Sequence, residues 1–67
     1  MRFDYTHGKE PRYMVSVHRE MTSDHMYHHY YQNALEMYEQ AKLKEDKGTA
    51  ISIYDLKNDV RKEFVKL

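Results

Sequence analysis

The sequence has no cysteine, no tryptophan, one proline and two glycines among its 67 residues. Without cysteine, disulfides, thiolate zinc sites and a cysteine nucleophile are excluded. No apolar run approaches the roughly 20 residues that span a membrane, and the N-terminal MRFDYTHGKEP lacks the apolar core of a secretory signal. We therefore expect a single cytoplasmic domain, of a size that buries only about 60% of its unfolded surface.

Neither sign of charge is in excess. Eleven Lys and Arg residues balance eleven Asp and Glu residues, with four of each sign in residues 1–30 and seven of each in residues 31–67. A dedicated nucleic-acid binder usually carries a basic patch or stripe. The net charge indicates no such partner, although folding can still sort the charges onto different faces.

The motifs of enzymes are also missing. Gly8 and Gly48 are the only glycines, so the chain has no glycine-rich phosphate loop, and no serine lies in a nucleophile elbow. A chain of this length has little room to enclose a ligand pocket of about 300 Å³. We expect a protein that is not an enzyme and has no cofactor.

What is present is a set of periodic segments. Apolar and polar residues alternate in RYMVSVHREM, residues 12–21, which predicts a strand. A second strand is predicted over residues 50–56, with Ile51 and Ile53 on one face, and a returning strand over residues 60–67. Asn58-Asp59 suits a two-residue turn, because both residues tolerate a positive φ. That turn would pair Ile53 with Phe64 and Asp55 with Lys62.

The segment between the first two strands is predicted to be one long helix, from about residue 24 to about residue 46. Thr22 or Ser23 can cap its start, and Gly48 suits its end. On a wheel of 3.6 residues per turn, the apolar residues of this segment fall on one broad face, with Ala34 and Ala41 at its middle. The predicted face comprises Met26, Tyr27, Tyr30, Tyr31, Ala34, Leu35, Met37, Tyr38 and Ala41.

Together these elements predict an α+β fold of order β-α-β-β. One long helix packs on one face of a three-stranded, or possibly four-stranded, mainly antiparallel sheet. The single domain covers residues 12–67. Residues 1–11 form an N-terminal arm or, through the alternation at Phe3 and Tyr5, a short edge strand.

Three histidines open the predicted helix, and two of them, His25 and His29, lie four residues apart on its polar side. Histidines at that spacing can chelate a transition metal. A biological zinc site needs three or four ligands, however, and the motif HExxH is absent. His18 or His7 would have to arrive through the tertiary fold. We expect no dedicated metal site, and His25 and His29 are candidates for weak binding only.

One helix covers one face of the sheet, and the other face is predicted to be half apolar, with Met, Tyr and His residues that are typical of interfaces. This favours a protein-binding module, and self-association as a homodimer. The predicted partner-binding residues are Met14, His18, Tyr54, Leu56, His25 and His29.

Nucleic acid is the alternative partner. Cations gather on the last hairpin, where tyrosines or His18 on an open sheet face would stack bases. The predicted nucleic-acid contacts of such a regulator are Lys57, Arg61, Lys62 and Lys66. Asp55, Asp59 and Glu63 are interleaved with these cations.

A short β-α-β-β chain without cysteine that ends in a hairpin such as ISIYDLKNDVRKEFVKL resembles the small accessory proteins of bacteriophages and mobile elements. The resemblance is one of size and architecture over residues 12–67. Proteins of this class often bind and block a host or defence protein, as anti-CRISPR proteins do. The resemblance therefore implies an inhibitor or modulator of a host protein, acting in the cytoplasm of a bacterial cell.

Overall fold

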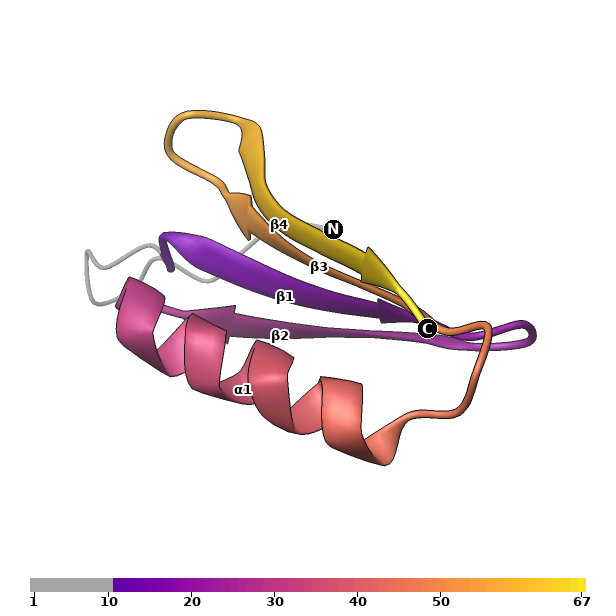
Figure 1. Cartoon of the computed structure of the whole chain (residues 1–67). Helices are drawn as coiled ribbons and strands as arrows, with labels where there is room; N and C mark the ends of the chain where they lie inside the picture. Colours follow the sequence, from indigo (N-terminus) through magenta and orange to yellow (C-terminus); the bar gives the residue numbers. More distant parts are fainter. Residues whose placement is uncertain (1–10) are drawn as a thin grey trace.

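The computed structural model describes residues 11–67. The predicted arm or edge strand at Phe3 and Tyr5 therefore lies almost wholly outside the described residues. The order of elements is β-β-α-β-β, and all strand pairs are antiparallel in one sheet of order β2-β1-β3-β4 (Figure 1). The elements are β1 (Tyr13–His18), β2 (Ser23–His28), α1 (Tyr31–Lys44), β3 (Ala50–Asp55) and β4 (Val60–Lys66).

The α+β class and the single helix on one face of the sheet are confirmed, but the predicted helix over residues 24–46 is wrong in its first part. Residues 23–28 form β2, and the helix begins at Tyr31. Length explains the difference. At about 1.5 Å per residue, a 23-residue helix would reach about 34 Å, well beyond a six-residue strand of about 20 Å. The observed 14 residues, at about 21 Å, match the strands.

Residues 23–28 form an edge strand of the sheet in place of the first turns of the predicted helix. Ser23, His25 and Tyr27 alternate with Asp24, Met26 and His28, and β2 pairs along its whole length with β1. The prediction that Thr22 or Ser23 caps the helix is therefore wrong. The N-cap is Tyr30, with an extended backbone and no capping hydrogen bond from its side chain.

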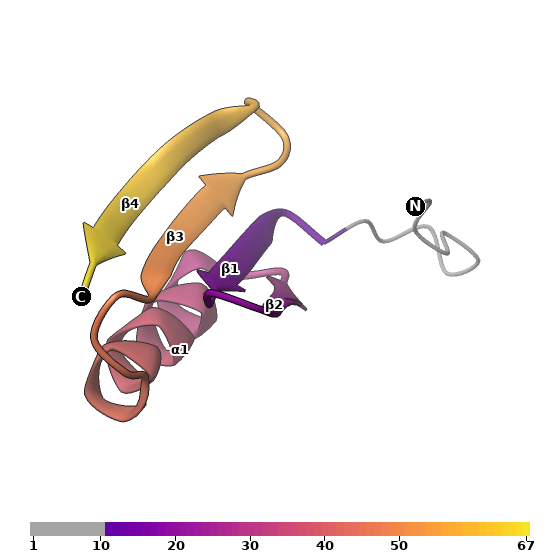
Figure 2. The same cartoon turned by 90° about the vertical axis from the view of Figure 1, so that its right-hand side faces the viewer.

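The core lies between α1 and one face of the sheet. The helix crosses β1, β3 and β2, whereas β4 extends beyond it (Figures 1 and 2). Ala34, Tyr38 and Ala41 are the buried residues of α1, as the wheel predicted for the middle of its apolar face. The small alanines allow the helix backbone to approach the strands. The core residues are Tyr13, Val15, Val17, Ala34, Tyr38, Ala41, Ile51 and Ile53.

Arg19 fastens the C-terminal end of the helix to the first hairpin. Its guanidinium donates to both carboxylate oxygens of Glu45, each at 2.7 Å, and to Asp24 Oδ2 at 2.6 Å. A bidentate pair of this kind fixes geometry as well as charge. The hydrogen bonds from Arg19 lower the pKa of Glu45 below its ordinary value.

The hairpin of β3 and β4 differs from the predicted two-residue turn. Residues 56–59 form the turn, and Asp55 pairs with Val60 and Ile53 with Glu63. The positive φ expected in this turn is found at Asp59 (56°). A register shift, or β-bulge, lies opposite Ile53 and Tyr54, with Lys62 as the extra residue of β4.

Candidate functional site

The sheet face turned away from α1 is identified from the strand register. We call it the open face because no helix among residues 11–67 lies on it, although Ser16 and Ser52 at its middle are buried. Because paired residues of antiparallel strands point to the same side, each cross-strand row can be assigned to one face. The core residues Val15, Val17 and Ile51 fix the helix side. The open face therefore comprises Met14, Ser16, His18, Ser23, His25, Tyr27, Ala50, Ser52, Tyr54, Arg61, Phe64 and Lys66.

Charge is sorted between the two sides of the sheet. The open face carries Arg61 and Lys66 and no Asp or Glu. The carboxylates within the strands, Asp24, Asp55 and Glu63, all fall on rows of the helix side. A chain of zero formal net charge thus presents one sheet face whose described residues are free of acidic side chains.

The bulge at Lys62 places a cation beside an exposed ring. Arg61 and Phe64 are three residues apart, which in a regular strand puts two side chains on opposite faces. The extra residue restores both to the open face, where the Arg61 guanidinium carbon lies 4.4 Å from the Phe64 ring centre. Phe64 is 49% exposed. An arginine stacked on an accessible ring is a surface suited to flat aromatic ligands.

Two histidines meet on the same face. His18 on β1 and His25 on β2 are diagonal neighbours, since His18 pairs with Ser23 and His25 pairs with Ser16. Their ring centres are 5.6 Å apart with an interplanar angle of 74°. Both side chains are exposed, whereas Ser16 beside them is buried. Its hydroxyl has no hydrogen-bond partner among the described residues.

The rings of the helix side have a different role. Tyr13 and Tyr31 meet edge to face at 5.4 Å, and the Tyr31 hydroxyl donates to Glu63 Oε2 at 3.2 Å. Burial, and then the nearby Glu63 carboxylate, raise the pKa of Tyr31. Burial likewise raises the pKa of Tyr38. These tyrosines hold the helix to the sheet.

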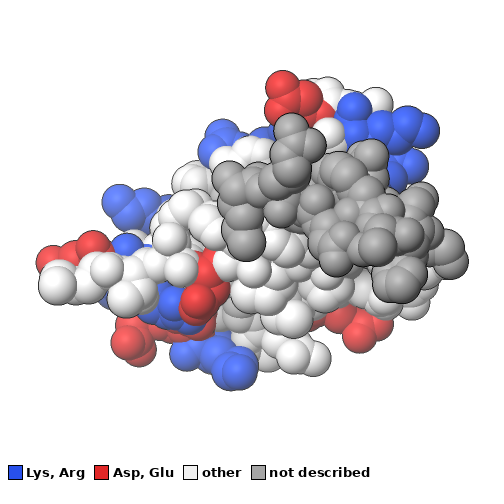
Figure 3. Space-filling model, turned by 180° about the vertical axis from the view of Figure 1, so that it is seen from behind, with Lys and Arg blue, Asp and Glu red and all other residues white. Residues whose placement is uncertain are grey.

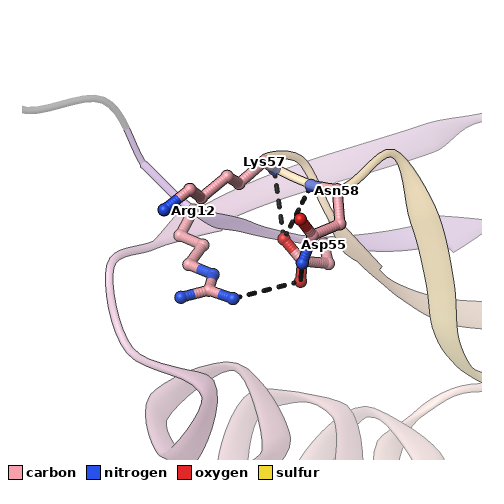
Figure 4. Close-up of polar contacts among 4 residues, drawn as sticks. All are labelled: Arg12, Asp55, Lys57 and Asn58. Atoms are coloured by element: carbon pink, nitrogen blue, oxygen red, sulfur yellow. Dashed lines mark hydrogen bonds and ion pairs between the residues drawn. The ribbon is translucent and has the colours of Figure 1, made fainter.

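Asp55 organises the end of the sheet nearest the β3–β4 turn (Figure 4). Its side chain is 1% exposed and accepts hydrogen bonds from the backbone N–H groups of Lys57 and Asn58, from the Asn58 amide at 2.9 Å and from Arg12 at 3.4 Å. Burial alone would raise the pKa of Asp55, but these donors outweigh it and hold the pKa below its ordinary value. The carboxylate explains why the chain turns at 56–59 and not at 58–59.

The lowered pKa of Asp55 predicts acid sensitivity. A carboxylate with a depressed folded pKa stabilises the fold above the unfolded pKa of about 3.9, and this stability is lost as the pH falls through the folded pKa. We expect Asp55→Asn to unfold at lower urea than the wild type at pH 7, with a gap that narrows below about pH 4. Urea unfolding across pH 2.5–7, followed by circular dichroism, measures this. A gap independent of pH would contradict it.

The structure brings four of the six predicted partner-binding residues together. Met14, His18, His25 and Tyr54 all lie on the open face. Leu56 lies in the β3–β4 turn, and His29 in the link before α1. The placement of His25 and His29 on one helix face is wrong, because His25 belongs to β2. His7 lies outside the described residues.

The four cations predicted to contact nucleic acid do not lie on one surface of the structure. Arg61 and Lys66 are on the open face, whereas Lys62 lines a shallow hollow with Tyr13, Tyr31 and Glu63 on the helix side. Lys57 lies in the turn. In the space-filling view from behind, Lys and Arg lie beside an acidic group near the end where β3 and β4 turn, and charges of both signs also mix at the opposite end (Figure 3).

Phe64 is a residue of the open face that the sequence did not predict, because the expected turn paired it with Ile53 of the core. Val65 pairs with Ile51, and Val65 and Leu67 pack against the core. The bulge reverses the faces of β4. In the observed register Phe64 lies opposite the small, polar Ser52 and not opposite Ile53.

These features define a small α+β protein whose four-stranded antiparallel sheet is covered by a helix on one side. Comparison of the chain with protein-family models, with curated proteins and with solved structures finds no match. Within residues 11–67, no helix has the length and apolar character needed to cross a membrane.

Proposed function

We propose that the protein binds single-stranded nucleic acid on its open face. The observation that carries this is the sorting of charge: a neutral chain presents a sheet face with Arg61, Lys66 and exposed rings, and without a carboxylate among its described residues. This combination can bind both the phosphates and the bases of a nucleic acid. Cations attract the phosphates, and aromatic side chains stack on bases of any sequence.

The arrangement of the face supports single strands over duplexes. RNA-binding domains with an open four-stranded sheet stack two or three unpaired bases on aromatic side chains of the sheet. Here Tyr54 and Phe64 lie on neighbouring strands, and Phe64 is already stacked under Arg61. The open face has no helix to place in a duplex groove, because α1 lies on the other side of the sheet (Figure 2).

Salt dependence tests this proposal. Fluorescence anisotropy with labelled single-stranded DNA and RNA should show binding at low salt, with the logarithm of affinity falling linearly with log salt. Each phosphate contact contributes about 0.7 to that slope for single strands, so Arg61→Ala should reduce the slope by about that amount. Lys44→Ala removes the same charge from α1, on the far side of the sheet, and should leave the slope unchanged.

The absence of binding to any single strand at low salt would overturn the proposal. Equal loss of affinity in Arg61→Ala and Lys44→Ala would also overturn it, since it would show attraction by overall charge and not by the open face. Duplex DNA of the same length should compete weakly, because its bases are already stacked.

A protein partner is the second candidate, and one observation favours it: Met14, His18, His25 and Tyr54 share a face, as expected for an interface. Under this reading the open face covers a host protein that the chain inhibits, or a second copy of the chain. Two results together would support this candidate against the first: the protein binds none of the oligonucleotides, and light scattering shows that it dimerises at high micromolar concentration.

A further inference from the structure

We propose that His18 and His25 form a binding site for a divalent transition metal of the zinc, nickel or copper class. This site goes beyond the proposed function and does not depend on it. The two histidines come from different strands, β1 and β2. Their spacing of seven residues matches no metal-binding motif of a single helix. The fold brings them together on an exposed surface.

The geometry of the two rings fits a shared metal. A zinc–nitrogen distance of about 2.0–2.1 Å puts the centre of each imidazole about 3.2 Å from the ion, and a tetrahedral angle then sets the two ring centres about 5 Å apart. The observed separation is 5.6 Å. Both side chains are exposed, so rotation about their side-chain bonds is the only change the site asks of the two rings as they turn from an edge-to-face contact toward a shared ion.

The surroundings of the pair supply a second observation. Ser16 lies opposite His25 and two residues before His18 on the same face, and its buried hydroxyl has no partner among the described residues. Histidines that ligate a metal commonly hydrogen-bond through their other ring nitrogen, and water on the metal also needs partners. The buried Ser16 hydroxyl, without a hydrogen-bond partner among residues 11–67, can accept from a ring N–H of a neighbouring imidazole.

The protein supplies two ligands to this site, the histidines. No group of three or more His, Cys, Asp or Glu residues is placed to hold a metal within residues 11–67. The remaining coordination positions therefore belong to water or to an incoming oxygen ligand.

Calorimetric titration of the untagged chain with zinc chloride at pH 7.5 tests the site. We expect saturation at one zinc per chain. His18→Gln and His25→Gln should each lower the affinity by at least about tenfold, since even the loss of an outer-sphere partner costs about 10- to 100-fold. His29→Gln is the matched control, because His29 is exposed in the link before α1 and outside the pair, and it should bind zinc as the wild type does.

Nickel provides a second readout that a purely structural role of the histidines would not give. Paramagnetic Ni²⁺ should broaden the ring signals of His18 and His25 in the wild-type NMR spectrum and leave those of His29 sharp. Circular dichroism confirms that each variant is folded. Zinc binding that never saturates, or that falls equally in His29→Gln, would overturn the proposal, as would unchanged binding in His18→Gln and His25→Gln.

Discussion

Ile53→Ala is expected to remove a large part of the protein's stability. Ile53 is fully buried between α1 and the sheet, beside Val15 on β1. Truncation of a buried isoleucine to alanine costs about 2–5 kcal/mol. At about 0.05–0.15 kcal/mol per residue, a chain of this length has a total free energy of unfolding of only about 3–10 kcal/mol. Thermal unfolding should show a midpoint lower by roughly 8–40 °C in the variant, and urea unfolding a lower midpoint concentration.

Phe64→Ala is the control for this experiment. Phe64 is also a large apolar residue on the β3–β4 ladder, but it lies on the open face and is half exposed. We expect it to change the free energy of unfolding by less than about 1 kcal/mol. Equal destabilisation by the two substitutions would contradict the assignment of the faces.

The same Phe64→Ala substitution should have its large effect on binding. Stacking of a base on an aromatic side chain is worth about 1–3 kcal/mol. The variant should therefore bind a single-stranded oligonucleotide about 5- to 150-fold more weakly than the wild type at the same salt concentration. Anisotropy titration measures this, and Phe64→Tyr should keep most of the affinity because it retains the ring.

Tyr30→Ala is the matched control for stacking. Tyr30 is 71% exposed, but it lies at the start of α1 and not on the open face. Its removal should leave the affinity unchanged. If Tyr30→Ala and Phe64→Ala weakened binding alike, or if Phe64→Ala had no effect, the bases would not stack where we propose.

Much of the fold follows from sequence periodicity, because apolar residues recur at every second position in 13–18 and in 50–55, whereas β4 was predicted from the turn before it. The helix was predicted too long because residues 23–28 and residues 31–44 both contain histidine or tyrosine without glycine or proline. No breaker marks the boundary at Tyr30. Only the tertiary requirement that β1 be paired on both sides, and that the helix match the sheet in length, separates a strand from a helix there.

The candidate site was harder to predict for a related reason. The face of a residue in β4 depends on a single bulge at Lys62, and one extra residue reverses every side chain beyond it. Net charge also concealed the site, since Asp55 and Glu63 are interleaved in sequence with Lys57, Arg61 and Lys62. Side chains in a strand alternate between the two faces of the sheet. In the observed register, Asp55 and Glu63 therefore lie on the helix side, and Arg61 and Lys66 lie on the open face.

The most direct test of the account uses the methionine methyl groups as markers of the faces. Met14 lies on the open face, Met26 on the helix side of β2 and Met37 on α1. A ¹³C-methyl-labelled sample is titrated with a single-stranded oligonucleotide of about eight nucleotides, within the site size of such sheets. Our account predicts that the Met14 signal shifts while those of Met26 and Met37 stay in place. Shifts at Met26 or Met37 without a shift at Met14, or no shift at all, would contradict it.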